Sequence, residues 1–366
     1  MTVSKIKAAI AGVGNCASAL LQGIYYYKNR PDGDRAGLMH PSIGGYVPGD
    51  IEIVTAFDID RRKVGKPLHE AIFASPNCAE VFIDLMEASS VIVKKGPLLD
   101  GMSDHMNAYP EDRRFLLTEE PECDVVAELT NSGAEILINF LPVGSAQATE
   151  FYADCALKAG VAFINCIPVF IGSDPVWAAK FEQAGLPVIG DDIKSQVGAT
   201  IVHRVLTRLC EERGARIKHT YQLNVGGNTD FLNMLNRERL AMKKVSKTEA
   251  VQSQLETPLK DENIHIGPSD FIPWLNDNKV CYIRMEGTEF GGVAFDLELK
   301  LSVQDSPNCA GVVIDIIRCC KLALDRGLSG PLPSVAAYTM KHPIVQYRDD
   351  EARERMELFI AGKIEK

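Results

Sequence analysis

The sequence lacks any long apolar run. Across its 366 residues, no stretch approaches the roughly 20 consecutive apolar residues that are needed to cross a bilayer. The short apolar segment near the start is interrupted by glycines, and no small-residue cleavage site follows it, which argues against an export signal. We therefore predict a soluble, cytoplasmic protein that makes no membrane contact.

Positive charge is also scarce. The chain has 39 Lys and Arg residues against 49 Asp and Glu residues, a formal net charge of −10 at pH 7. Because proteins hold the phosphates of nucleic acids with surplus Lys and Arg, this balance argues against a nucleic-acid binder. Any anionic substrate must be bound by a local basic pocket.

The ten cysteines include no CxxC motif. They are scattered singly apart from Cys319 and Cys320, and several, such as Cys155 and Cys166, stand among apolar residues. This usage is typical of buried thiols in a reducing compartment, and it does not favour a zinc site built from neighbouring ligands.

Internal repeats and low-complexity tracts are absent, and the composition is that of an ordinary globular protein, with 46% hydrophobic and 24% charged residues. A single hydrophobic core stops growing near roughly 250–300 residues. A chain of this length is therefore expected to form two folding units.

A glycine-rich turn near the start is the first pattern that carries chemistry. An apolar strand over residues 6–11 precedes the sequence G-x-G-x-x-A at 12–17, and a helical run follows. Gly12 would make the tight turn, Gly14 would let a pyrophosphate approach the backbone, and the helix N-terminus would face the phosphates. The same motif also occurs in turns that hold no ligand.

The next strand, residues 51–60, ends in Asp58 and Asp60. An acid at the carboxyl end of the second strand can accept hydrogen bonds from both ribose hydroxyls, which favours NAD over NADP. Asp58 follows Gly12 by more than twice the usual spacing of about 20 residues, so residues 28–50 would form an inserted loop. A solvated acid at a strand end is the alternative interpretation.

The order of helices and strands predicts an α/β fold. Apolar strands alternate with helices up to about residue 200, as in a doubly wound parallel sheet with both faces covered. Residues 293–301 instead alternate apolar and polar side chains, which is typical of antiparallel strands. We predict a Rossmann-like NAD-binding domain from residues 1–200 and 310–366. An inserted α+β domain, residues 201–309, would carry a mostly antiparallel sheet.

The segment GDDIKS, residues 190–195, crowds polar groups of both signs between a strand and a helix. Open α/β sheets bind ligands at the carboxyl ends of their strands, so Asp191, Asp192 and Lys194 are expected at a cleft. Ser195 is predicted to cap the following helix. The core face of that helix would be formed by Val197, Ile201, Val205 and Leu209. Solvated charges around an elaborate N-cap are the alternative.

Several long motifs occur in order over nearly the whole chain: GVGNCASAL, AFDID, FLPVGS, GDDIKSQVGAT, LNVGGNTDFLNM, KKVSK and DSPNCAGVVID. They resemble the signature segments of the myo-inositol-1-phosphate synthase (inositol-3-phosphate synthase) family, particularly its short bacterial branch. Because several of these motifs are long and unusual, they are far more specific than the glycine turn alone.

The resemblance implies an NAD-dependent isomerase, an intramolecular lyase, that converts D-glucose 6-phosphate to 1L-myo-inositol 1-phosphate for inositol and phospholipid synthesis. Members of the family oxidise C5, enolise C6, close the ring onto C1 by an aldol step, and reduce C5 again. The resemblance also implies a homotetramer that uses the middle-domain sheet. Some members use a divalent cation such as zinc and others use ammonium, although this sequence shows no compact metal-ligand cluster.

Chemistry of this kind needs cations, because the substrate phosphate, an enolate-like oxygen and an alkoxide are all negative. Lys243 and Lys247 would lie one helical turn apart, so burial and mutual repulsion would lower their pKa values and let one act as a base. By resemblance, Lys247 is the acid/base at the C5 oxygen, Lys243 contacts substrate and cofactor, and Lys341 stabilises an oxyanion. Taken singly, each would be a solvated surface amine.

Lys279 matches the family pattern less closely, because larger members carry a lysine where this chain has Gly291 and Gly292. Which lysine binds the substrate phosphate therefore stays open. By the same resemblance, Asp192 and Asp305 would orient the lysines or accept protons.

The resemblance also assigns residues to the cofactor, and for Cys16 it favours a backbone contact over thiol chemistry. Asn228 and Asp230, which would otherwise be ordinary turn residues, would lie against the substrate and the nicotinamide. The cofactor positions are Gly12, Gly14, Asn15, Cys16, Asp58, Ser132, Tyr152, Ser195, Asp230 and Lys243.

Two other functions fit the same architecture. An ordinary NAD-dependent dehydrogenase acting on a related sugar phosphate would release NADH, whereas the synthase would show no net change at the nicotinamide band. A non-catalytic NAD-binding sensor would be expected to lack the lysines, which are present.

Overall fold

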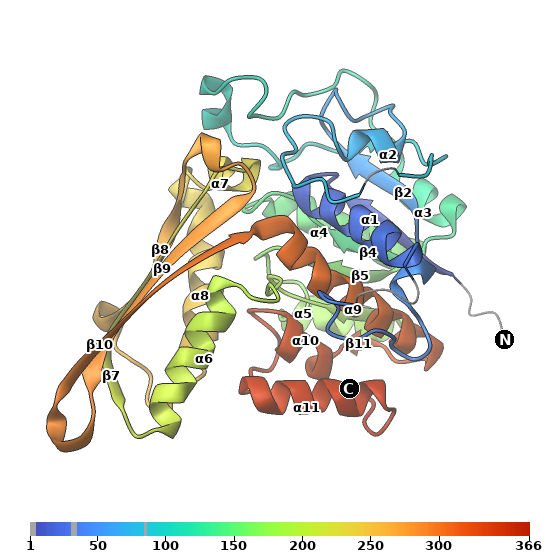
Figure 1. Ribbon diagram of the computed structural model, residues 1–366. Coiled ribbons are helices and arrows are strands. Elements are labelled where there is room, and N and C mark those ends of the chain that lie inside the picture. The colour runs from blue at the N-terminus through green and yellow to red at the C-terminus, as the bar shows by residue number, and fades with distance from the viewer. Residues whose placement is uncertain (1–4, 31–34, 84–85) are drawn as a thin grey trace.

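Two β-sheets organise the chain in the computed structural model, which describes residues 5–30, 35–83 and 86–366. The larger sheet is wrapped by helices, and the smaller one extends away from it on the left of Figure 1. Helices α6 (Ala199–Glu212) and α8 (Ala241–Gln252) lie between the two sheets in this view. Among the described residues, no helix is long and apolar enough to cross a membrane.

The larger sheet has the strand order β11-β6-β5-β4-β1-β2-β3, and its strand pairs are parallel. This arrangement confirms the predicted doubly wound α/β fold. Its strands are β1 (Ile6–Ala11), β2 (Ile51–Asp58), β3 (Lys94–Lys95), β4 (Ile136–Asn139), β5 (Ala162–Asn165), β6 (Pro187–Ile189) and β11 (Gly330–Pro331).

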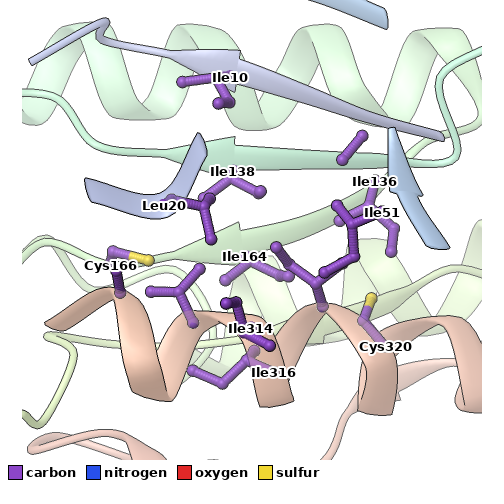
Figure 2. Packing of buried hydrophobic residues seen from close by; sticks show 14 of the residues in the cluster. Ile10, Leu20, Ile51, Ile136, Ile138, Ile164, Cys166, Ile314, Ile316 and Cys320 are labelled. Carbon is purple, nitrogen blue, oxygen red and sulfur yellow. The ribbon is translucent and has the colours of Figure 1, made fainter. Parts of the chain in front are cut away.

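Helices cover both faces of this sheet, which explains why its central strands are mostly apolar. Ile136 and Ile138 of β4 face the core under α1 and α9, whereas Leu137 joins the core under α3, α4 and α5. Figure 2 shows Ile138 and Ile164 on the α9 side, facing Ile314. The helices are α1 (Asn15–Lys28), α2 (Leu68–Ala71), α3 (Val125–Ser132), α4 (Ala146–Ala159), α5 (Pro175–Gln183), α9 (Asp305–Asp325), α10 (Pro333–Thr339) and α11 (Asp349–Ile360).

The smaller sheet has the strand order β10-β9-β7-β8. Its β7–β9 and β9–β10 pairs are antiparallel and its β7–β8 pair is parallel, so the predicted mostly antiparallel sheet is confirmed. The predicted domain boundaries stay a prediction. The strands are β7 (Arg216–Gly226), β8 (Ile264–Phe271), β9 (Asn278–Thr288) and β10 (Ala294–Gln304), and the short helix α7 (Thr229–Asn233) follows β7.

Helix α6 differs from the prediction in its start and in its buried face. It begins at Ala199 and its N-cap makes no side-chain hydrogen bond, so Ser195 does not cap it. His203 and Arg204 are fully buried instead, because His203 bonds side chains of β7 and Arg204 binds the Asp349 carboxylate. Three residues of the expected core stripe are about half exposed: Val197 (57%), Val205 (52%) and Leu209 (49%).

Candidate active site

A crevice runs along the carboxyl edge of the parallel sheet, where the loops after β1, β2, β4 and β5 meet. It consists of two adjoining cavities, of which the first is lined by Gly12, Asp58 and Tyr152 and the second by Asp192, Ser195 and Asp230. The two cavities share Gly14, Phe115, Phe140, Leu141 and Pro142. The crevice therefore crosses the end of β1 with the glycine turn at its middle.

The glycine turn has the geometry that an anion needs. Gly12 has φ +95°, and a Cβ there would lie 2.7 Å from the carbonyl oxygen of Phe140. A Cβ on Gly14 would meet no atom within 4 Å, so this backbone faces open space. Helix α1 begins at Asn15 without a side-chain cap and without an acid in its first turn. Its free N–H groups and positive helix end can therefore receive a pyrophosphate.

Asp58 is fixed against this turn. Its Oδ2 accepts a hydrogen bond from the Val13 N–H (2.8 Å), and its Oδ1 accepts from the N–H groups of Ile59 (2.7 Å) and Asp60 (2.8 Å). Beneath the turn, the buried Lys63 donates to the Val13 carbonyl (2.8 Å). Sequence reasoning missed Lys63, because a lysine after two arginines looks like part of a solvated charge run.

The side chains of Asn15 and Cys16 are occupied within the protein. Asn15 Oδ1 accepts hydrogen bonds from the N–H groups of Cys78 (2.6 Å) and Ala79 (2.9 Å), so its amide oxygen is already used within the protein. A hydrogen bond with Cys309, together with burial, raises the pKa of the Cys16 thiol well above its usual value. Cys16 therefore stays an uncharged thiol at the helix start.

The structure places two further predicted cofactor residues, Tyr152 and Ser132, far apart. Tyr152 is buried against Phe57 (ring centroids 5.7 Å apart) and lines the first cavity. Ser132 ends α3 immediately before β4, and Glu135 in the following turn bonds the Lys7 backbone at the start of β1. Ser132 thus lies at the amino edge of the sheet, opposite the crevice. Its prediction as a cofactor residue is corrected.

Three lysines reach the crevice from separate parts of the chain, and each is paired with a carboxylate that also lines it. The pairs are Lys341–Asp192 (2.7 Å), Lys279–Asp305 (3.0 Å) and Lys243–Asp230 (3.2 Å). Each of these three pairs is therefore brought together by the fold rather than by closeness in sequence.

Asp192 is held from two sides. Its Oδ1 accepts from Lys341 Nζ, and its Oδ2 accepts from the hydroxyl of the buried Ser246 on α8 (2.7 Å). The Lys341 N–H also donates to the Asp192 backbone carbonyl (2.7 Å), which keeps the C-terminal segment alongside the GDDIKS loop. Although burial opposes ionisation, the ammonium groups of Lys341 and Lys243 lower the pKa of Asp192 below its usual value. Asp192 is therefore a stable counter-ion.

Lys247 occupies a different setting. Its side chain is 7% exposed and lines a third cavity, beside α8 and outside the crevice, with Lys243 common to this cavity and the second one. Among the described residues it forms no ion pair with a carboxylate. Burial, followed by the positive charges of Lys243, Lys279 and Lys341, lowers its pKa well below 10.5. Its neutral amine can therefore act as a base.

Asp191 and Lys194 support the loop from behind. The Asp191 carboxylate accepts hydrogen bonds from the backbone N–H groups of Ile171, Gly172 and Ser173, each at 3.0 Å. Lys194 is fully buried and donates to a carbonyl of α10 (2.6 Å), and burial lowers its pKa to about 7. Neither lines the crevice, so their prediction as cleft residues is corrected.

With this geometry in hand, comparisons with known proteins identify the family. The family model described as Myo-inositol-1-phosphate synthase matches residues 198–306. The inositol-3-phosphate synthase of Corynebacterium glutamicum is 54% identical, covering 98% of this chain and 99% of that protein. The chain belongs to the inositol-3-phosphate synthase family. The synthase of Mycolicibacterium smegmatis is 53% identical and covers 98% of both chains.

Solved structures agree on the fold. A myo-inositol-1-phosphate synthase-related protein from Thermotoga maritima superimposes with a TM-score of 0.81 at 24% identity, covering 98% of both chains. At that identity the likeness shows the shared fold alone. The predicted resemblance to the inositol-3-phosphate synthase family, an enzyme family of the isomerase class, is confirmed.

Besides Lys63, two buried residues behind the crevice escaped the sequence reasoning. Ser246, which bonds Asp192, lies inside the KKVSK motif, but only its lysines drew attention. Asp277 precedes Lys279 by two residues in NDNK, where it reads as a turn residue. A polar residue next to a candidate lysine was the available signal in both cases.

Proposed function

We propose that this chain is an inositol-3-phosphate synthase that converts D-glucose 6-phosphate to 1L-myo-inositol 1-phosphate with bound NAD. The observation that carries the proposal is the convergence of Lys243, Lys279 and Lys341 on a crevice that has a glycine turn suited to a nucleotide at its middle. A cycle without net redox change must keep its hydride and exclude water, and a crevice between two sheets suits that need.

The crevice residues fit NAD. The adenosine half would lie in the first cavity beside Asp58, and the pyrophosphate would lie on Gly14 and the start of α1. The nicotinamide half would lie in the second cavity near Asp230 and Ser195. When bound, NAD accepts a hydride from C5 of the sugar and later returns it.

The residues of the chain handle the protons and the negative charge. Lys247, as a neutral amine, would take the C5 hydroxyl proton and give it back when C5 is reduced. Lys341 and Lys279 would stabilise oxyanions as ammonium groups. Asp192 keeps Lys341 paired, and although burial opposes it, Asp305 raises the pKa of Lys279 above its usual value. One neutral and two charged amines can thus act together.

We also propose a cytoplasmic homotetramer that uses the outer face of the smaller sheet, with the domain division predicted from the sequence. Tyr221, Leu223 and Tyr282 lie on that face and are 37–44% exposed, and Leu223 pairs directly with Tyr282. Exposed apolar side chains on a sheet that ends in the edge strands β8 and β10 favour association between copies.

The predicted divalent cation or ammonium ion stays a prediction. Among the residues that the structure describes, no group of three or more His, Cys, Asp or Glu side chains is arranged to hold a metal ion. A cation would therefore have to be shared between one or two side chains and the phosphates of cofactor and substrate.

The test incubates purified protein with glucose 6-phosphate and a catalytic amount of NAD. We expect inositol phosphate, detected by its periodate-labile phosphate, without a net change at the nicotinamide band. Stoichiometric NADH would instead indicate a dehydrogenase. Bound NAD without product, under varied monovalent and divalent cations, would indicate a sensor.

A further inference from the structure

Asp277 is a buried acid that the steps above do not use. It lies directly before β9, two residues before Lys279, and is 1% exposed. It does not line the crevice. An acid in such a place needs several hydrogen bonds to compensate its burial.

Asp277 joins three segments that carry site residues. Its Oδ1 accepts hydrogen bonds from Asn228 Nδ2 (2.9 Å) and the Ser306 hydroxyl (2.8 Å). Its Oδ2 accepts from the Ser306 N–H (3.0 Å), and its backbone carbonyl accepts from the Asp305 N–H (3.0 Å). The residue thus connects the GGNTD turn, the start of β9 and the start of α9.

Each arm of this network ends at a crevice lysine. The Asn228 amide oxygen caps α7 by accepting from the Asp230 N–H (3.1 Å), and Asp230 pairs with Lys243. On the other side, Asp305 pairs with Lys279. Rotation of the Asp277 carboxyl group would therefore disturb both pairs.

We propose that Asp277, as a carboxylate, is a positioning residue for the reaction. It holds Asp230 and Asp305 in place, and through them the ammonium groups of Lys243 and Lys279. The proposal rests on the proposed function, which it deepens by naming a residue that acts through others.

The protonation of Asp277 supports this role. Burial and then the nearby charge of Asp305 raise its pKa to about 6, against the opposing hydrogen bonds. Below that pH, a proton occupies an oxygen that now accepts hydrogen bonds, so one contact is lost. The other titratable groups near it are Lys279 on β9, Arg113 through its bond to Asn276, and the thiols of Cys16 and Cys78.

Protonation of Asp277 should change the stability of the fold and the activity of the enzyme in opposite directions. Because the folded-state pKa of Asp277 is raised from 3.8, its contribution to stability is fully present below pH 3.8 and is lost as the pH rises through about 6. Synthase activity, in contrast, should fall as the pH falls through about 6. A purely structural role would not give this pairing.

The first test compares Asp277→Asn with Asp270→Asn, a change at an exposed acid of β8. Asparagine replaces one carboxylate oxygen with an NH2 group, which cannot accept a hydrogen bond. We therefore expect kcat to fall by roughly 10- to 100-fold, while NAD affinity changes less than about threefold. At saturating substrate and low pH, the limiting slope of log kcat plotted against pH should be smaller by one in Asp277→Asn than in the wild type, because the variant lacks the carboxyl group that titrates there. The Asp270→Asn protein should match the wild type.

The second test uses Ser306→Ala, which removes one hydrogen bond to the carboxylate form. The acid limb that belongs to Asp277 should then move to higher pH, because the charged form is less stabilised. If Asp277→Asn does not fold, Ser306→Ala still tests the positioning role of Asp277. A wild-type rate and an unmoved acid limb in the folded variants would overturn the proposal alone. A wild type that makes no inositol phosphate would overturn the proposed function, and this proposal with it.

Discussion

Replacing Lys247 by methionine tests the assignment of the base. Methionine keeps the length and the apolar stem of the side chain but removes the amine. General-base catalysis contributes about 10²- to 10⁴-fold, so kcat should fall by that factor. At about 1.36 kcal/mol per tenfold, this corresponds to roughly 2.7–5.4 kcal/mol in the activation free energy.

The same change should not weaken the fold. Since burial and three neighbouring lysines hold the Lys247 pKa well below its unfolded value of 10.5, the folded state disfavours the ammonium form. Folding at neutral pH therefore works against this charge, and methionine removes that cost. We expect a Tm equal to or above that of the wild type, with a difference that shrinks as the pH rises toward 10.5.

The assay measures kcat for inositol phosphate, the Kd for NAD by calorimetry and the Tm of each protein. Lys244→Met is the matched control, because Lys244 is exposed on the same helix and forms no ion pair among the described residues. The control should keep its rate and its NAD affinity. The reasoning fails if Lys247→Met retains kcat within about tenfold of the wild type.

Three further changes address the cofactor site, the core and the assembly. Gly12→Ala would place a Cβ 2.7 Å from the Phe140 carbonyl at φ +95°, so calorimetry should show NAD affinity reduced by about tenfold or more. Ile164→Ala, in the core of Figure 2, should lower the free energy of unfolding by about 2–5 kcal/mol in urea titrations without changing KM. Tyr282→Lys should reduce the mass measured by light scattering, and an unchanged mass would exclude the outer sheet face as the interface.

Periodicity predicted the elements well where burial and apolar character coincide. The central strands of the larger sheet are apolar on both faces, and apolar and polar side chains alternate along β10, as the sequence indicated. The prediction for α6 was wrong because its buried face is polar: His203 and Arg204 are satisfied by partners on other elements, which spacing cannot reveal. The apolar residues were therefore placed in the core although they face outward.

The candidate site divides in the same way. Local chemistry identified the glycine turn, and motif resemblance identified the lysines, but Ser132 was misplaced because a short motif does not say which sheet edge it occupies. Asp277 was missed because its partners, Asn228 and Ser306, lie 49 and 29 residues away.

The sequence by itself determined the order of strands and helices, the nucleotide-binding turn and the family, because these depend on neighbours along the chain. Only the tertiary structure decided which charges meet. Asp192 and Lys341 are 149 residues apart yet form a 2.7 Å ion pair, while Lys247 lies near them with no carboxylate partner in the described part of the chain. Because a pKa depends on burial and on charges nearby in space, the fold alone decides which lysine has a pKa low enough for the proposed base.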